Sequence, residues 1–171
     1  NRNPEVIVAP RIKNEDGSEQ RSVRNLLIPV ILLNAILPIS RNISLSWIIR
    51  RFDYAKDKRV EQPLYSLLFM TRETFDRVGL MDLRFPLFFN DVDWFLRAKR
   101  AGVKTMYRAG PAVTHSHGFS TGKQPFRKLA RSTASMARYF VKHYPAVALF
   151  LLPLIGGSAM ARVVRETWRR R

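Results

Sequence analysis

Apolar runs separated by polar, turn-forming segments predict an alternation of strands and helices along most of the chain. Residues 5–9 form a short, β-branched apolar run, which predicts a buried strand ended by Pro10. Residues 11–23 are polar and centre on an Asp-Gly turn dipeptide, so a hairpin or an exposed loop is expected. Residues 26–49 are apolar but broken by prolines, which favours short helices on the protein or on a membrane surface over one spanning helix.

The middle of the chain begins with a predicted strand and a short helix. Residues 64–70 are apolar and predict a strand. Residues 72–78 predict a helix, because Thr71 is a suitable N-cap and Gly79 a suitable end.

A second helix is predicted over residues 91–101, after an aromatic-rich loop. Asn90 is the expected N-cap, acidic residues stand in the first turn, and basic residues stand in the last. This arrangement of charges complements the helix dipole. Two short strands are predicted next, over 104–107 and 112–115.

The last part of the chain is helical and unusual in its charge. Residues 124–143 predict one basic amphipathic helix, or two. Residues 144–161 carry no formal charge and have basic residues on both sides, at a length close to the roughly 20 residues of a membrane span. We expect residues 144–171 to be a membrane-associated tail with the protein on the cytoplasmic face. The alternative is that residues 147–155 dock as an ordinary core helix.

Composition narrows the class of protein without naming a function. The chain has 171 residues, of which 46% are hydrophobic and 25% charged, so a disordered or collagen-like chain is excluded and one domain, or part of one, is expected. It has no cysteine, which excludes disulfides and thiolate metal sites. Lys and Arg number 30 against 13 Asp and Glu, and the net charge of +17 predicts attraction to polyanions.

A series of short motifs in a fixed order covers the middle of the chain. They are LLFMTRETF at 67–75, VGLMD at 78–82, NDVDWFLR at 90–97, and VTH at 113–115 followed by Gly118 and Ser120. Upstream stand APR at 9–11 and DGS at 16–18. Together this series resembles the C-terminal, acceptor-side half of family-2 glycosyltransferases, particularly the rhamnosyltransferase-like branch.

The resemblance implies a fold and an activity. The fold would be α/β: a partial GT-A-like mixed sheet flanked by helices over residues 1–143, with the basic and apolar helical tail over 144–171. The nucleotide-binding half, with its Asp-x-Asp metal motif, would precede Asn1. The reaction would be inverting, metal-dependent transfer of a sugar from a nucleotide-diphosphate sugar to a hydroxyl of a glycan or lipid-linked acceptor, in bacterial cell-surface polysaccharide synthesis. The isolated chain is expected to be inactive.

The resemblance also implies two chemical roles. Asp91 would be the general base that accepts the proton of the acceptor hydroxyl, and a carboxylate at a helix N-terminus is kept ionised by the dipole. His115 would help to ligate a divalent cation, Mg²⁺ or Mn²⁺, that neutralises the leaving diphosphate. The alternative for Asp91 is an acidic residue that merely complements the helix N-terminus.

Further residues are candidates for substrate binding. They are Asp93, Trp94, Tyr65, Ser120 and Arg97. Structural roles are the alternative for several of them, since Asp93 can pair with Arg97 four residues later and Trp94 can pack in the core. Tyr65 and Ser66 stand where the family has Gly-Ala, and Asn90 replaces the family's Glu.

Two other functions remain open from the sequence. The net charge also suits a basic nucleic-acid-binding module, although no zinc-finger, RNP-type or Gly-x-x-Gly signature is present, and we expect no nucleic-acid partner. A non-catalytic, membrane-associated scaffold is the third possibility. On the leading hypothesis the partners are a nucleotide-diphosphate sugar, a glycan or lipid-linked acceptor, and an anionic membrane surface.

Overall fold

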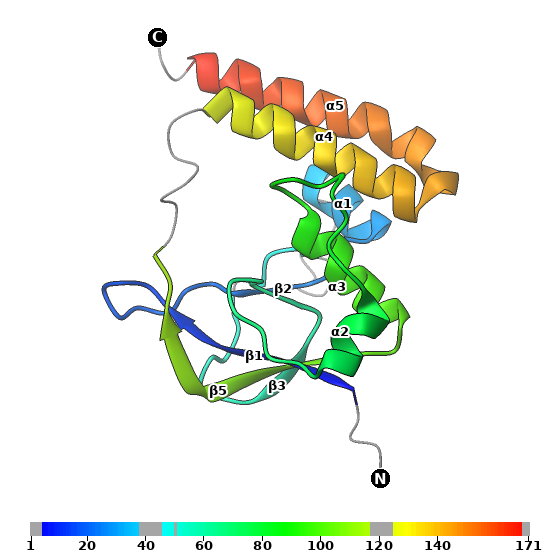
Figure 1. Ribbon diagram of the computed structural model, residues 1–171. Coiled ribbons are helices and arrows are strands. Elements are labelled where there is room, and N and C mark those ends of the chain that lie inside the picture. Colours follow the sequence, from blue (N-terminus) through cyan, green and yellow to red (C-terminus); the bar gives the residue numbers. More distant parts are fainter. Residues whose placement is uncertain (1–4, 38–45, 50, 117–124, 169–171) are drawn as a thin grey trace.

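A computed structural model of the chain describes residues 5–37, 46–49, 51–116 and 125–168. Within these residues the fold is mixed α/β, with a three-stranded mixed sheet, a two-stranded sheet and five helices. The predicted α/β class is therefore confirmed. In Figure 1 the sheet lies at one end of the molecule and two long helices lie at the other, with the shorter helices between them.

The larger sheet has the order β1-β5-β3. β1 (Val6–Lys13) runs parallel to β5 (Lys104–Thr114), and β3 (Lys58–Val60) runs antiparallel to β5 on its other side. Ile7 and Ile12 of β1 are buried, so the strand contributes side chains to the interior at both of its ends.

The prediction that Pro10 ends the first strand is wrong, and so is the division of residues 104–115 into two strands. Both strands continue, but their register shifts, since Pro10 pairs with Arg108 and Arg11 with Ala112. Proline has no N–H to donate to the ladder, and strands tolerate it at such irregularities. The shift therefore lets both strands pass the proline.

The predicted strand over residues 64–70 is also wrong. Phe69 alone forms an isolated bridge, in which its N–H and carbonyl pair with those of Val8 at 2.9 and 2.8 Å. The other apolar side chains of this segment pack as a loop against the hydrophobic core: they are Tyr65, Leu68 and Met70. An apolar run indicates burial but does not decide between a strand and a packed loop.

A second, two-stranded sheet brings two distant segments together. β2 (Val23–Arg24) pairs antiparallel with β4 (Gln62–Pro63), and Arg24 lies opposite Gln62. This pairing places both residues beside the start of the helix that begins at Asn90, where the candidate site lies.

The two predicted helices of the middle region are confirmed, with one change at a cap. α2 is Arg72–Val78, and the Thr71 hydroxyl accepts from the Thr74 N–H at its start. α3 is Asn90–Arg100, so Asn90 lies inside the helix and is not its N-cap. The N-cap is Phe89, which adopts a left-handed conformation with φ of 68°. Such a conformation is uncommon for a residue other than glycine and is often found at functional sites.

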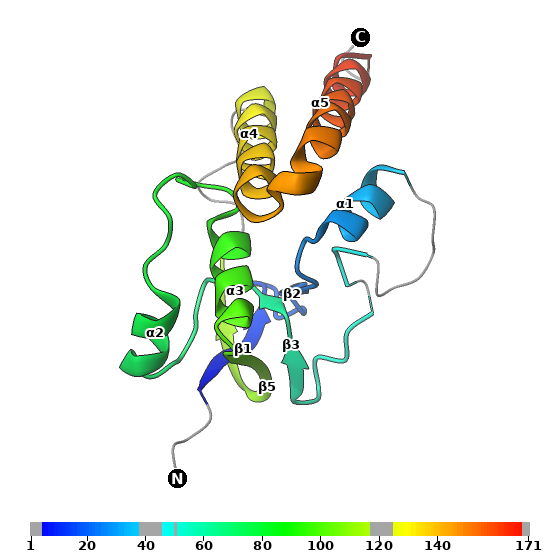
Figure 2. The same cartoon turned by 90° about the vertical axis from the view of Figure 1, so that its right-hand side faces the viewer.

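Three further helices complete the structure. α1 (Pro29–Ile36) is the short helix expected from the proline-broken segment. α4 (Pro125–His143) and α5 (Pro145–Trp168) form a helical hairpin with one residue between them. Figures 1 and 2 show α4 and α5 together at one end of the molecule, with α1 below α5.

A buried carboxylate ties α3 to α4. The Asp93 side chain is 0% exposed. Its Oδ2 accepts from Arg97 Nε at 2.9 Å, and its Oδ1 accepts from His143 Nε2 at 2.7 Å and from the Lys142 ammonium. Lys142 also reaches Asp82 Oδ2 at 2.8 Å, so the loop before α3 joins the same network.

The hydrogen bonds of His143 define its tautomer. Arg100 Nη1 lies 2.9 Å from His143 Nδ1, and a guanidinium can only donate, so Nδ1 accepts. The proton of the neutral ring is then on Nε2, which donates to Asp93. The end of α4 is thus held by two residues of α3 at once.

We predict that Asp93→Asn destabilises the fold by about 3 kcal/mol, because it leaves the partly buried cations Arg97 and Lys142 without their anion. Urea denaturation measures this change. Asp76→Asn is the matched control, since Asp76 forms only an exposed pair with Arg72 among its described contacts and should cost less than about 1 kcal/mol. Equal effects of the two substitutions would show that the buried network is not stabilising.

The network also predicts sensitivity to acid. Burial alone would raise the pKa of Asp93, but the bonds from His143, Lys142 and Arg97 outweigh it and lower the pKa from 3.8 to about 2. A lowered pKa means that the charged form stabilises the folded state above pH 3.8, and that this stability is lost as the pH falls through about 2. Denaturation midpoints measured between pH 5 and pH 2 should therefore fall more steeply in wild type than in Asp93→Asn. If the midpoints of wild type and Asp93→Asn fell in parallel with pH, the loss of stability in acid would come from other carboxylates.

Candidate functional site

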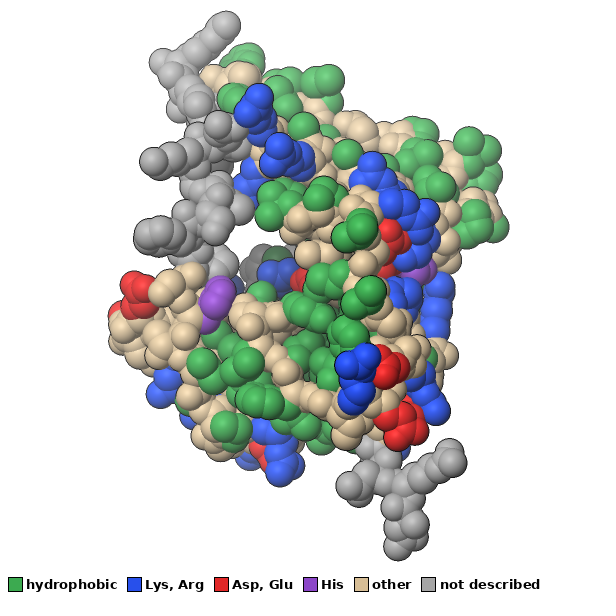
Figure 3. Space-filling model, in the orientation of Figure 1, with side chains coloured by type: hydrophobic (Ala, Val, Ile, Leu, Met, Phe, Trp, Pro, Cys, Tyr) green, Lys and Arg blue, Asp and Glu red, His purple; other side chains and the backbone are tan. Residues whose placement is uncertain are grey.

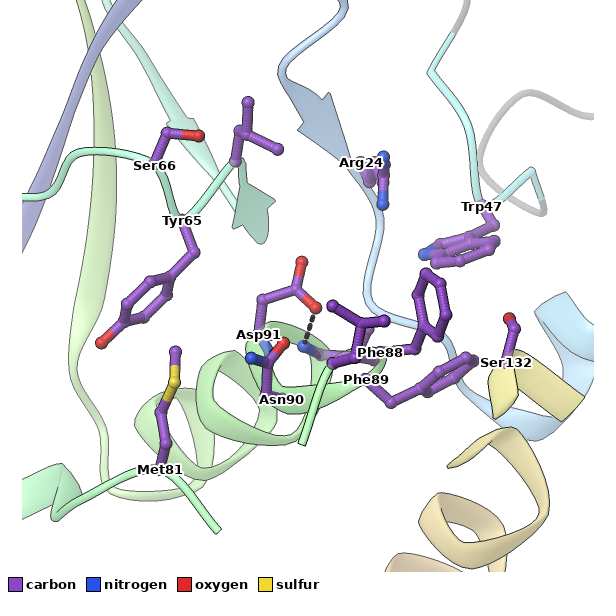
Figure 4. Close-up of a pocket in the computed structure, with 13 residues that line it drawn as sticks. Arg24, Trp47, Tyr65, Ser66, Met81, Phe88, Phe89, Asn90, Asp91 and Ser132 are labelled. Carbon is purple, nitrogen blue, oxygen red and sulfur yellow. Dashed lines mark hydrogen bonds between the residues drawn. The ribbon is translucent and has the colours of Figure 1, made fainter. Parts of the chain in front are cut away.

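A pocket of about 400 Å³ opens at the N-terminal end of α3. Its walls come from β2, the loop after β4, the loop before α3, α3 itself and α4, so segments distant in sequence meet there (Figure 4). The lining residues include Arg24, Trp47, Tyr65, Ser66, Phe88, Phe89, Asn90, Asp91 and Ser132. The pocket is lined by several aromatic rings and, among the described residues, by a single carboxylate.

Asp91 stands in the first turn of α3 with its carboxylate in this pocket (Figure 4). The side chain is partly buried, and Oδ1 accepts from the Val92 N–H at 2.9 Å. Oδ2 is 3.3 Å from Gln62 Nε2. The carboxylate is thus positioned by neutral donors and, among the described contacts, by no ion pair, which leaves its lone pairs suited to accept a further proton.

Three neighbours of Asp91 were not predicted as site residues. Gln62 is buried, and its Oε1 accepts from Trp47 Nε1 at 3.4 Å while its amide nitrogen donates to Asp91. Arg24 lies over the Trp47 ring, with its guanidinium carbon 5.3 Å from the ring centroid. No pattern in the sequence predicts that a buried glutamine orients a carboxylate. This position of Gln62 could be recognised only from the β2–β4 pairing in the structure.

Tyr65, one of the residues predicted for substrate binding, lines the pocket. Its ring packs edge-to-face against Trp94 and Phe95, with centroids 5.3 and 5.9 Å apart. Burial raises the pKa of its hydroxyl, which therefore stays protonated at neutral pH. Tyr65 thus forms part of the pocket wall while its ring packs against the core.

Asp93, Trp94 and Arg97 do not line the pocket in the described structure. Trp94 is 0% exposed, and its Nε1 donates to the Gly79 carbonyl at 2.8 Å. Arg97 bonds to Asp93 and to the carbonyls of Val78 and Leu80. These residues therefore hold α3 in place by contacts outside the pocket and do not face a ligand there. Ser120 lies outside the described residues.

His115 contacts Ser66, which is a residue of the pocket wall. His115 Nε2 is 3.1 Å from Ser66 Oγ, and Nδ1 is 3.1 Å from Gln20 Oε1. Since Ser66 lines the pocket that contains the Asp91 carboxylate, His115 lies beside that pocket.

Two contacts of the His115 ring are with the neutral side chains of Ser66 and Gln20. Mg²⁺ and Mn²⁺ prefer carboxylate oxygens as ligands. Across the described ranges, no three His, Asp or Glu side chains gather closely enough to hold a metal ion. The divalent cation stays a prediction of the resemblance, and no chemical step is derived through it.

Comparisons of the chain with models of protein families, with curated proteins and with solved structures find no match. The glycosyltransferase resemblance therefore stays a prediction, and the case for a function depends on the motif series and on the geometry of this pocket.

Because no three His, Asp or Glu side chains gather within the described ranges, we predict that the chain alone does not hold a transition metal at His115. With equimolar Mn²⁺, the ring-proton NMR signals of His115 should broaden no more than those of the buried His143, which serves as an internal reference. Selective broadening of the His115 signals would show instead that this residue belongs to a metal site.

Proposed function

We propose that the chain is the acceptor-side part of an inverting glycosyltransferase, with Asp91 as its general base. The donor would be a nucleotide-diphosphate sugar, and the acceptor a hydroxyl of a glycan or of a lipid-linked sugar of a bacterial cell-surface polysaccharide. On this proposal the donor-binding half and the metal motif belong to a part of the enzyme that precedes Asn1.

One observation carries the proposal: the carboxylate that the motif series marks as the base is the carboxylate in the pocket. Asp91 and Asp93 are two residues apart in one motif, yet only Asp91 lines the pocket, and Asp93 is fully buried. A general base must reach the proton that it takes. Asp91 meets that geometric requirement and Asp93 does not.

The chemistry assigned to the chain is a single displacement. The acceptor oxygen would form a bond to the anomeric carbon of the donor sugar as the bond from that carbon to the phosphate oxygen breaks. The acceptor proton would pass to an Asp91 carboxylate oxygen, and the nucleoside diphosphate would leave with the electron pair of the broken bond. Gln62 would hold the carboxylate in the orientation that this transfer needs, through its bond to Oδ2.

The pocket suits a sugar in size and lining. A volume of about 400 Å³ falls within the roughly 300–1,000 Å³ range of small-molecule sites. Trp47, Phe88 and Phe89 provide apolar faces on one side of Asp91, while Ser66 provides a hydroxyl on the other (Figure 4). A pyranose has both apolar ring faces and hydroxyl edges, so this mixed lining matches its chemistry.

We predict that Asp91→Asn in the full-length enzyme lowers kcat for sugar transfer by about 100-fold or more, the usual contribution of a general base. Asn is close in size and still accepts a hydrogen bond, so donor binding should change little. The assay is transfer of labelled sugar from a panel of nucleotide-diphosphate sugars to a cell-envelope glycolipid extract.

Asp76→Asn on α2 is the control for this experiment, because Asp76 is exposed and pairs only with Arg72 among its described contacts. It should keep wild-type transfer. Circular dichroism of both variants checks that the fold is intact. Near wild-type transfer by folded Asp91→Asn would reject this residue as the base.

A further inference from the structure

α5 has one buried face, which docks on the rest of the molecule. Ala148, Leu151 and Ile155 are buried and are spaced by three and four residues, so they form one stripe of the helix. Leu151 and Ile155 belong to the same core cluster as Ile31 and Leu32 of α1 and as Tyr139 and Phe140 of α4. The N-terminal half of α5 is therefore a part of the core.

The opposite face of α5 is apolar and exposed. Positions 146, 150, 153, 157, 164 and 168 lie on this side by helical spacing, and none of them is charged. Phe150 is 72% exposed and Trp168 is 79% exposed, and Leu149 and Met160 beside them are 75% and 64% exposed. We call this the outer face of α5. A contiguous apolar surface of this kind marks an interaction site.

Basic side chains lie on the same helical hairpin as the outer face. Arg127, Arg131 and Arg138 form one exposed stripe of α4, on the side where Arg138 bonds to the Arg84 carbonyl. Arg162 and Arg165 are exposed near the end of α5. Figure 3 shows hydrophobic side chains gathered over α5, with Lys and Arg side chains beside them. An apolar face on so basic a hairpin is complementary to a membrane surface that carries anionic lipids.

We infer that the α4–α5 hairpin binds an anionic membrane with α5 in the plane of the bilayer and its outer face in the boundary between headgroups and acyl chains. The proposal concerns a surface remote from Asp91 and does not depend on the transferase activity. It also decides between the two arrangements open from the sequence, a tail that spans the membrane and one that lies on it.

The length of α5 alone would allow this helix to span a membrane. Residues Pro145–Arg165 are long and apolar enough to cross a membrane, and 24 residues of helix extend about 36 Å. A spanning α5 would either take the arginines of α4 into the bilayer, which is unfavourable, or separate from α4 and α1. Separation would expose their buried partners, including Tyr139 and Phe140, to water. The in-plane arrangement avoids both costs.

A second copy of the chain fits the outer face less well than an anionic membrane does. Pairing two copies through α5 would bring the basic side chains of both α4 helices close together in a protein with a net charge of +17. Like charges repel across such an interface, whereas anionic lipid headgroups neutralise them.

Vesicle co-sedimentation of the whole chain tests the surface. Binding to phosphatidylglycerol–phosphatidylethanolamine vesicles should be at least about tenfold tighter than to phosphatidylcholine vesicles. Phe150→Gln should weaken it by about tenfold, because it removes a buried aromatic contact with lipid. Phe69→Gln is the matched control, since Phe69 is also exposed, at 56%, but lies at the sheet edge. Equal binding to both vesicles, equal effects of both variants, or a stable dimer that binds no vesicle would each overturn the proposal.

Cysteine labelling tests the orientation, and the chain contains no cysteine of its own. Val147→Cys and Thr167→Cys place one exposed thiol near each end of α5, at positions away from the outer face. In membranes from cells that express the protein, both thiols should react with an impermeant maleimide from the same side. Reaction of the two thiols from opposite sides would show a spanning helix and would overturn the in-plane arrangement.

Discussion

The placement of the helices around the site depends on the burial of one carboxylate, Asp93. A charged group without contact to water is unfavourable unless cations and hydrogen bonds compensate it. Arg97 supplies this compensation from α3 itself, and Lys142 and His143 supply it from α4. Because these partners are fixed by the same anion, α4 is held against α3, and Ser132 of α4 is brought to the wall of the pocket.

The same helix explains why two neighbouring acids have different surroundings. Residues two apart on an α-helix point about 200° from each other, so Asp91 and Asp93 lie on opposite sides of α3. The side that faces α4 is closed by the ion network, while the side that faces β2 and β4 is open to the pocket. The rigid burial of one carboxylate therefore holds in place the turn that presents the other.

Local signals in the sequence predicted the elements that local chemistry determines. Thr71 and Gly79 bracket α2, and the charges at the two ends of α3 match its dipole, so both helices were predictable. The run at 64–70 was mistaken for a strand because burial in a loop gives the same apolar pattern. The partners of Asp93, some 50 residues later, and Gln62 beside Asp91 come from tertiary contacts that no local pattern encodes.

α4 connects the pocket with the surface proposed to meet the membrane. Ser132 of α4 lines the pocket, and α4 packs along α5. An α5 in the interfacial plane is therefore joined to the pocket through α4. A lipid-linked acceptor has its lipid in the bilayer and its sugar at the level of the headgroups. The proposed in-plane α5 and the proposed acceptor of this class are thus compatible, although each was inferred from different residues.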